Sequence, residues 1–249
     1  NEHPDNGDVM TAVVLAADPK KISAVRQNGE AVEITGEGLR PAQSGLSEKA
    51  PPKTKIRRGA VIRVVKTPKN TWEITQLPEV EGAFIALDPR DGALRALVGG
   101  FDFNKNKFNH ATQAWRQPGS SFKPFIYSAA LEKGFTPSTM VNDAPLFFDA
   151  GVTGGQPWEP KNYDGKFEGP MQLHTALAKS KNMVSIRILQ AVGTQNAQEW
   201  ITRFGFEADK HPPYLTMALG AGSVTPLQMA TAYSVFANGG YRINPWIIT

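Results

Sequence analysis

The sequence has 249 residues, 41% of them hydrophobic, and a net charge of +4, so it can form the core of one large domain or two smaller ones. It has no cysteine, and its four histidines are scattered, which excludes a disulfide framework, a thiolate metal site and a local zinc motif. We therefore expect neither a metal nor a cofactor. No apolar run approaches 18 residues, so any membrane anchor is expected outside this segment.

The first third of the sequence consists of short strand patterns separated by turn signals. Asn28-Gly29 predicts a hairpin, because both central residues of a type I′ turn take positive φ. Residues 36–52 are rich in Gly, Pro, Ser and Gln, which predicts a long exposed loop. Five short strands favour a small barrel of the oligonucleotide/oligosaccharide-binding (OB) type over residues 1–80. The predicted strands are 9–16, 22–25, 31–34, 60–66 and 71–77.

Residues 81–249 show a different pattern, a hairpin followed by helices. Two apolar strands are predicted around the turn at Asp88-Pro89-Arg90-Asp91-Gly92. The last helix has a capping-box pattern, with Thr225 before its first residue and Gln228 three positions later. The fold class is therefore α+β, with a small all-β domain at 1–80 and a second domain at 81–249 that joins a sheet to a helical region. The predicted elements are strands 83–87 and 93–98 and helices 120–134, 171–178, 183–192, 197–204 and 226–237.

Ser120 and Lys123 lie three residues apart at a predicted helix start, which puts a hydroxyl and an amine on one helix face. A serine attacks a carbonyl poorly unless a neighbouring group takes its proton, and a lysine can do so only if its pKa is lowered. The apolar residues that follow, such as Phe125 and Ile126, would bury this segment and desolvate the lysine. A serine that caps a helix, followed by a surface lysine, has the same Ser-x-x-Lys sequence. The pair alone therefore does not indicate a catalytic function.

Ser180 and Asn182 form the single Ser-x-Asn of the sequence, in the break between two predicted helices. A loop at that point can present a hydroxyl and an amide to one pocket. Serine and asparagine are also ordinary residues of interhelix loops. The order and spacing of the two motifs favour a functional interpretation over that one.

Ser-x-x-Lys followed by Ser-x-Asn resembles the signature of penicillin-binding proteins and serine β-lactamases. The longer runs resemble the transpeptidase domain of bifunctional, class A penicillin-binding proteins of type 1a, from about residue 82 onward. The strand-rich segment before it resembles the accessory domain that these proteins carry. The runs are RQPGSSFKP at 116–124, WEPKN at 158–162, AKSKN at 178–182 and ALGAG at 218–222.

This resemblance implies a serine-type D-Ala-D-Ala transpeptidase that cross-links peptidoglycan stem peptides and is acylated by β-lactams. Ser120 would be the nucleophile and Lys123 would take its proton, although the identity of the acylation base is disputed in relatives. Ser180 would relay a proton to the leaving group. Asn182 would hold the substrate amide and orient Lys123.

The resemblance also implies a setting. A glycosyltransferase domain and a membrane anchor would belong to a longer protein at the periplasmic face of the bacterial inner membrane. An outer-membrane lipoprotein regulator would dock on the OB-like domain. No nucleic-acid partner is expected, because no set of stacking aromatics accompanies the basic cluster at 53–58.

The third motif of the family, Lys-Thr/Ser-Gly, does not occur in the sequence. Lys66-Thr67-Pro68 is the nearest string, and it lies far upstream of Ser120. In the family this strand supplies one of the two N–H donors to the oxyanion, and losing one such donor costs about 10²–10³-fold in rate. We therefore expect residues 1–249 alone to be inactive or weakly active.

Other enzyme classes fit less well. A class A β-lactamase would need a Glu-x-x-x-Asn loop after Ser180, and an α/β-hydrolase would need Gly-x-Ser-x-Gly; neither pattern is present. A β-lactam-binding or peptidoglycan-binding module that is acylated without turnover remains as the alternative.

Overall fold

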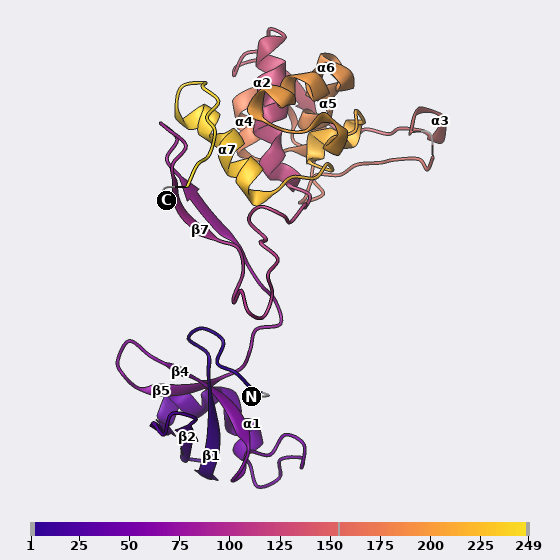
Figure 1. Ribbon diagram of the computed structural model, residues 1–249. Helices are drawn as coiled ribbons and strands as arrows, with labels where there is room; N and C mark the ends of the chain where they lie inside the picture. Colours follow the sequence, from indigo (N-terminus) through magenta and orange to yellow (C-terminus); the bar gives the residue numbers. More distant parts are fainter. Residues whose placement is uncertain (1–2, 154, 248–249) are drawn as a thin grey trace. The chain divides into compact units, whose positions relative to one another are not determined.

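The computed structural model describes residues 3–153 and 155–247, and their contacts divide the chain into two compact units (Figure 1). The outermost residues of the two predicted domains, 1–2 and 248–249, lie outside this description. The first unit ends at Gly82 but also includes Gly100–Phe108, which the sequence division gave to the second domain. Hydrogen bonds join this segment to the rest of the first unit: Asn6 Nδ2 donates to Asp102 Oδ2 at 2.8 Å, and Asn106 Nδ2 donates to Glu81 Oε2 at 2.8 Å.

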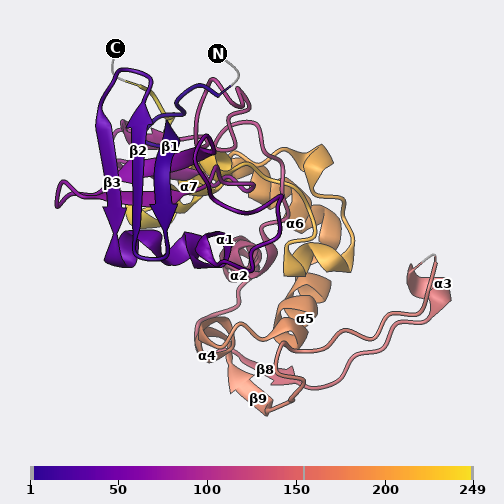
Figure 2. The ribbon, with the colours of Figure 1, turned by 90° about the horizontal axis from the view of Figure 1, so that it is seen from below.

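The first unit contains a five-stranded antiparallel sheet in the order β3-β2-β1-β4-β5. Its edge strands β3 and β5 also contact each other, so the sheet is nearly closed, as in a small barrel. Apolar side chains that alternate along the strands, such as Val32 and Ile34 of β3, fill its interior. Figure 2 shows β1, β2 and β3 side by side. The strands are β1 (Met10–Asp18), β2 (Lys21–Arg26), β3 (Ala31–Thr35), β4 (Val61–Lys66) and β5 (Trp72–Thr75).

The turn between β2 and β3 lies where the sequence predicts it, but the predicted turn type is wrong. Gly29 has a φ of 85°, whereas Asn28 is not among the residues at positive φ. The N–H of Arg26 donates to the carbonyl of Glu30 at 2.9 Å, so three residues rather than two form the loop. Loops of this length need only one left-handed residue, which explains why the glycine alone adopts that conformation.

The prediction of a long exposed loop at 36–52 is wrong for residues 36–46. Gly36–Ala42 forms a 3-10 helix, η1, and Gln43–Leu46 forms the short helix α1. Leu39 and Leu46 are buried in the core of the sheet. Two spaced leucines among glycines and polar residues give a weak sequence signal, and burial against the sheet supplies the stability that local propensity lacks.

Gly38 of η1 lies against the backbone of β5, and its replacement is the first test of this packing. A Cβ at position 38 would be 2.6 Å from the carbonyl oxygen of Trp72, so Gly38→Ala is expected to destabilise the first unit by about 1–3 kcal/mol. Gly82→Ala is the matched control, because a Cβ there meets nothing within 4 Å. Urea unfolding followed by circular dichroism measures both variants, and equal stabilities would contradict the packing described here.

The second unit contains two separate hairpins and a set of helices. β6 pairs with β7, and β8 pairs with β9, both antiparallel. None of the helices in the described ranges is long and apolar enough to span a bilayer. The elements are β6 (Phe84–Leu87), β7 (Leu94–Val98), η2 (Gly119–Phe122), α2 (Lys123–Glu132), β8 (Met140–Asp143), α3 (Ala150–Thr153), β9 (Gly169–Gln172), α4 (Leu173–Ala178), α5 (Asn182–Val192), α6 (Thr194–Ile201), η3 (Thr202–Phe204), η4 (Ala208–Lys210), η5 (Leu215–Leu219) and α7 (Pro226–Ala237).

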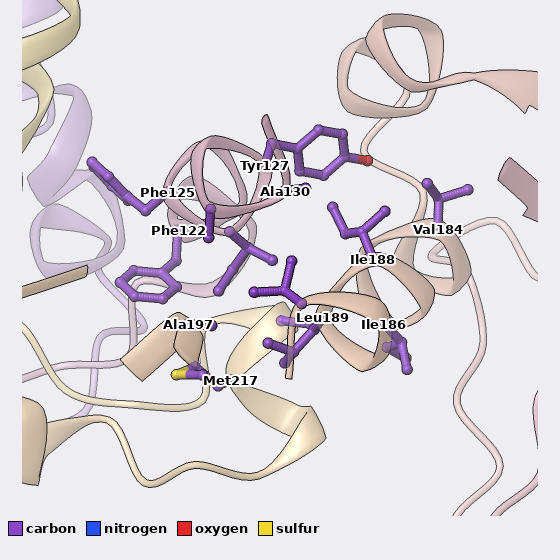
Figure 3. Packing of buried hydrophobic residues seen from close by; sticks show 14 of the residues in the cluster. Phe122, Phe125, Tyr127, Ala130, Val184, Ile186, Ile188, Leu189, Ala197 and Met217 are labelled. Atoms are coloured by element: carbon purple, nitrogen blue, oxygen red, sulfur yellow. The ribbon is translucent and has the colours of Figure 1, made fainter. Parts of the chain in front are cut away.

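The core of the second unit forms around α2 and α5. Both helices are apolar over most of their surface, and α5 buries Ile186, Ile188 and Leu189 completely or nearly so. Figure 3 shows Ile188 and Leu189 on the side of α5 toward α2, whereas Ile186 points away from α2. A helix that is apolar on most sides needs neighbours on most sides. The elements that frame the predicted motifs are therefore held from several directions.

Of three predicted helix starts, one agrees with the structure and two differ from it. The capping box of α7 is confirmed, with Gln228 N–H donating to Thr225 Oγ1 at 3.2 Å and Thr225 N–H donating to Gln228 Oε1 at 3.3 Å. The helix predicted from residue 120 begins as the 3-10 turn η2 and becomes α-helical at Lys123. The helix predicted from residue 171 begins at Leu173, because Met171 pairs with Val141 in the β8–β9 hairpin. The α+β class is confirmed.

Candidate active site

Ser120 lies in η2, the tight turn that leads into α2, and its side chain is exposed. Neighbouring groups fix this turn on both sides. Ser121 Oγ donates to the carbonyl of Pro118 at 2.6 Å, and the hydroxyl of Tyr233 on α7 donates to the carbonyl of Ser121 at 2.6 Å. Phe122 is completely buried behind the turn. The serine is thus an exposed hydroxyl on a firmly held backbone.

The backbone before Ser120 is also in close contact with the segment 218–222. Gly119 N–H donates to the carbonyl of Gly220 at 3.2 Å. Gly220 has a φ of 71°, and a Cβ there would be 2.1 Å from the carbonyl oxygen of Gly119. Only glycine fits this position, which gives a physical reason for the glycine within the run at 218–222.

Ser180 lies in the short connection between α4 and α5. Its φ is 54°, a left-handed conformation that costs a non-glycine residue about 1–3 kcal/mol and that is typical of functional sites. Two hydrogen bonds hold the connection: Ser180 N–H donates to the carbonyl of Leu177 at 3.0 Å, and Lys181 N–H donates to that of Ala176 at 3.0 Å. Asn182 is the first residue of α5. The predicted loop between two helices is confirmed.

Lys123 joins the two motifs. Its ammonium group donates to the carbonyl of Ser180 at 2.7 Å, to Ser180 Oγ at 3.0 Å and to Asn182 Oδ1 at 2.6 Å. The residue is 1% exposed, and this burial lowers the pKa of Lys123 to about 8. About a tenth of the side chains would therefore be neutral at pH 7, against fewer than one in a thousand for a free lysine. A neutral amine has a lone pair that can accept a proton.

A cavity of about 590 Å³ adjoins the two motifs, and Ser120, Ser180 and Asn182 all line it. Lys123 lies behind its wall. Within the described residues no hydrogen bond joins Lys123 to Ser120, since all three bonds of the ammonium go to the 180–182 segment. The structure thus brings the four predicted residues to one place, but in this state Lys123 is bonded to the second motif. No cluster of three or more acidic or histidine side chains in the described ranges is arranged to hold a metal ion.

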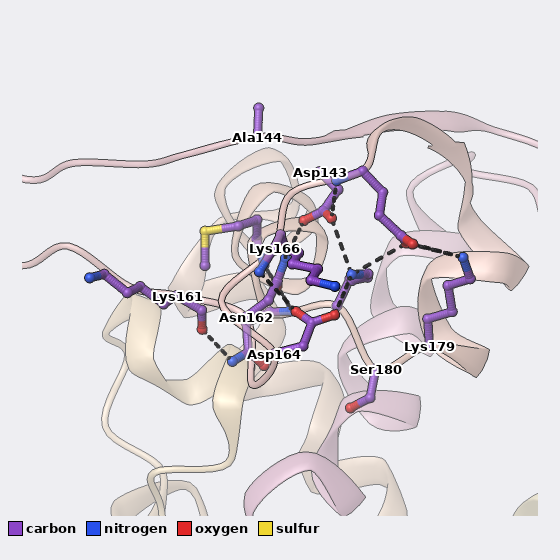
Figure 4. A network of polar contacts seen from close by, with 12 residues as sticks. Asp143, Ala144, Lys161, Asn162, Asp164, Lys166, Lys179 and Ser180 are labelled. Carbon is purple, nitrogen blue, oxygen red and sulfur yellow. Dashed lines mark hydrogen bonds and ion pairs between the residues drawn. The ribbon is translucent and has the colours of Figure 1, made fainter.

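Sequence reasoning missed three residues at the cavity: Asn162 and Lys181, which line it, and the buried Asp143. Asn162 donates to Asp143 Oδ1 at 2.7 Å, and Lys181 Nζ lies 3.5 Å from Asp143 Oδ2 (Figure 4). Lys181 is 5% exposed; burial lowers its pKa, but hydrogen bonding to Glu168 and the charges of Asp143, Asp164 and Glu168 outweigh this, so its pKa is raised. Asn162 belongs to the run at 158–162 and Lys181 to the run at 178–182, which were the available signals, whereas Asp143 had none.

Comparisons with known proteins decide the family. The model of the penicillin-binding protein transpeptidase domain matches residues 82–249, and that of the penicillin-binding protein OB-like domain matches residues 1–80. The chain belongs to the penicillin-binding proteins. The two matches leave only residue 81 of this chain uncovered, and Ser120, Lys123 and the cavity that Ser120 lines fall within the transpeptidase match.

Similar relatives of this chain carry the name penicillin-binding protein 1A. The chain is 49% identical over 241 residues to the one from Neisseria lactamica and 44% identical over 248 residues to the one from Pseudomonas aeruginosa. It covers 30% of the length of each, while 96% and 97% of this chain is matched. The crystal structure of penicillin-binding protein 1A from Haemophilus influenzae superposes with a TM-score of 0.84 at 37% identity, over 98% of this chain and 35% of that one. The resemblance drawn from the motifs is confirmed.

Proposed function

We propose that the chain provides the acyl-transfer site of a peptidoglycan DD-transpeptidase, which joins stem peptides through a serine ester. One observation carries the proposal: Lys123, buried and with its pKa lowered to about 8, contacts both Ser180 and Asn182 at a cavity that Ser120 lines. A nucleophile, a base and a relay group are thus adjacent. The family matches support the same class of enzyme.

In the first half of the reaction, Ser120 Oγ would attack the carbonyl carbon between the two D-alanines of a donor stem peptide. The Oγ proton would pass to the neutral amine of Lys123. As the C–N bond breaks, the departing D-alanine nitrogen would take a proton from Lys123 through Ser180 Oγ, which lies 3.0 Å from Lys123 Nζ. The product is an ester of Ser120 and free D-alanine, with Lys123 neutral again.

In the second half, an amine from a neighbouring stem peptide would attack the ester carbonyl. Its surplus proton would return through Lys123 to Ser120 as the ester bond breaks, which restores the enzyme and leaves the cross-link. A β-lactam presents a strained amide to the same serine. Because its leaving group stays attached after ring opening, the acyl-enzyme is blocked against the amine, which accounts for inhibition.

The wider setting is part of the proposal. The reaction would take place at the periplasmic face of the bacterial inner membrane, where stem peptides are exposed, and a longer protein would add the glycosyltransferase. An outer-membrane lipoprotein would dock on the OB-like unit. Support for a docking surface comes from Val13 and Leu15 of β1 and Val61 of β4, which are 40%, 50% and 45% exposed.

The test of this function is product analysis with the longest natural chain that contains residues 1–249. A stem peptide ending in D-Ala-D-Ala is supplied with a second stem peptide as acceptor, and mass spectrometry measures D-alanine and cross-linked dimer. The proposal expects both products in equal amounts. D-alanine without dimer would identify a carboxypeptidase instead. Penicillin labelling without either product would identify a binding module that is acylated without turnover.

A further inference from the structure

Asn162 makes an unusually complete set of hydrogen bonds for a loop residue. It is 4% exposed, and its Nδ2 donates to Asp143 Oδ1 and to the carbonyl of Lys166, both at 2.7 Å (Figure 4). Its Oδ1 accepts from the backbone N–H groups of Asn182 at 2.9 Å and Met183 at 3.3 Å. Two donors and two acceptor positions are thus all in use, and a flipped amide would face four groups of the wrong kind.

The acceptor side of Asn162 fixes the first residue of α5. The backbone N–H groups of Asn182 and Met183, which donate to Asn162 Oδ1, are among those that a helix leaves without internal partners at its N-terminus. Lys161, the residue before Asn162, holds the side chain of Asn182. Asn182 Nδ2 donates to the carbonyl of Lys161 at 2.8 Å. The other end of that side chain, Oδ1, receives the hydrogen bond from Lys123. Backbone and side chain of Asn182 are therefore both anchored by residues 161–162.

The donor side of Asn162 is anchored in turn by Asp143. This carboxylate is 0% exposed and lies at the end of β8, where Asp143 pairs with Gly169 of β9. Its second oxygen accepts from the N–H of Glu168 at 2.9 Å and faces Lys181 Nζ. The Asp143 carboxylate is thus held in one orientation by two N–H donors and the nearby ammonium of Lys181, and it accepts the hydrogen bond from Asn162 in that orientation. The chain of contacts thus runs from the β8–β9 hairpin through Asn162 and Asn182 to Lys123.

We propose that Asn162, held by Asp143, is a positioning residue that sets the orientation of Asn182 and thereby of Lys123. The role rests on the proposed function, in which Lys123 takes the proton of Ser120. Asn162 does not act on the substrate in this proposal, although it borders the cavity. A plain helix cap would stabilise α5 without affecting Lys123, and this difference separates the two roles.

The test measures the titration of Lys123 directly, by the ¹³Cε resonance of that lysine in this chain, assigned with Lys123→Arg. Asn162→Leu removes all four hydrogen bonds without adding charge. Without its anchor, Asn182 no longer presents Oδ1 to the ammonium, so the midpoint of Lys123 is expected to fall by about one pH unit. Asn142→Leu is the matched control, an exposed asparagine next to Asp143, and should leave the midpoint unchanged.

Exchanging the residues at positions 143 and 162, so that aspartate stands at 162 and asparagine at 143, tests the proposal even if Asn162→Leu does not fold. Asn162→Asp alone places two carboxylates face to face and should displace the titration of Lys123. Adding Asp143→Asn restores the donor and the acceptor between positions 143 and 162 with the same net charge as the wild type. The carbonyl of Lys166 still lacks the donor that Asn162 gave it, so the midpoint should return part of the way to the wild-type value. A folded Asn162→Leu variant with the wild-type midpoint, or a folded double variant as perturbed as Asn162→Asp, would overturn the proposal.

This readout separates the positioning role from the proposed reaction. The titration of Lys123 needs no substrate and no acylation. If the midpoint moves as expected but no D-alanine is released by the longest natural chain, the positioning role stands and the transpeptidase function fails. If D-alanine is released but the midpoint does not respond to Asn162, the function stands and the positioning role fails.

Discussion

Replacing Lys123 with arginine is expected to slow the acylation of Ser120 by about 10²–10⁴-fold, the range that general-base catalysis contributes. Arginine keeps the positive charge and can still donate to Ser180 and Asn182, but it does not lose a proton at accessible pH. The Lys123→Arg variant therefore removes the proposed proton acceptor and keeps a positive charge at position 123. The measurement is the second-order rate constant for labelling by a fluorescent penicillin.

Lys133→Arg serves as the control for this substitution. Lys133 lies at the other end of α2 and is exposed, so the rate should match the wild type. Acylation of Lys123→Arg within a few-fold of the wild type would show that another group takes the proton of Ser120, and the proposed mechanism would have to be abandoned.

The proposed role of Lys123 as the base also predicts how the labelling rate of the wild type depends on pH. Burial lowers the pKa of Lys123 to about 8, and only the neutral amine accepts a proton. Below that value each unit of pH should reduce the labelling rate tenfold, and above it the rate should level off. A rate that stays constant from about pH 6 to about pH 9 would argue against Lys123 as the base.

Phe125→Ala is expected to destabilise the second unit by about 3–5 kcal/mol, which is a large share of the stability of a typical domain. Phe125 is 0% exposed, and its ring lies 4.8 Å from that of Phe206, 5.0 Å from that of Phe204 and 5.3 Å from those of Tyr233 and Phe236. Truncation would open a cavity among aromatic rings of two other segments, 204–206 and α7.

The effect should extend to Ser120. Tyr233 packs on Phe125 and its hydroxyl donates to the carbonyl of Ser121, so a loosened ring cluster also loosens the turn that presents the proposed nucleophile. Urea unfolding followed by tryptophan fluorescence measures the loss. Phe147→Ala, at a position 66% exposed in the same unit, is the control and should change stability by less than about 0.5 kcal/mol. A loss below 1 kcal/mol for Phe125→Ala would contradict the described packing.

The sequence predicts the class of fold and the positions of the candidate residues because both depend on local patterns. Alternating apolar residues define β3, and the capping box defines the start of α7. The two motifs at 120–123 and 180–182 are likewise short-range signals, and the family resemblance gives them meaning. Their catalytic roles stay predictions, since no comparison assigns a role to an individual residue.

What the sequence does not predict depends on contacts between distant segments. Asp143 carries no local signal, and its importance appears only when β8 brings it to Asn162, 19 positions later in the chain. The hydrogen bonds of Lys123 to Ser180 and Asn182 span 57 and 59 positions, and spacing alone suggested a contact with Ser120 instead. The helical turns of η1 and α1 form because burial of Leu39 and Leu46 outweighs a local composition that favours a loop.

The central claim is that Ser120 is the acylated nucleophile, and the intact mass of the protein after treatment with penicillin tests it most directly. The longest natural chain that contains residues 1–249 should gain the mass of one drug molecule. Peptide mapping should place the adduct on the segment 116–124, and Ser120→Ala should gain nothing, whereas Ser121→Ala should behave as the wild type. An adduct that persists in Ser120→Ala, or a wild-type protein that takes up no drug, would contradict the claim.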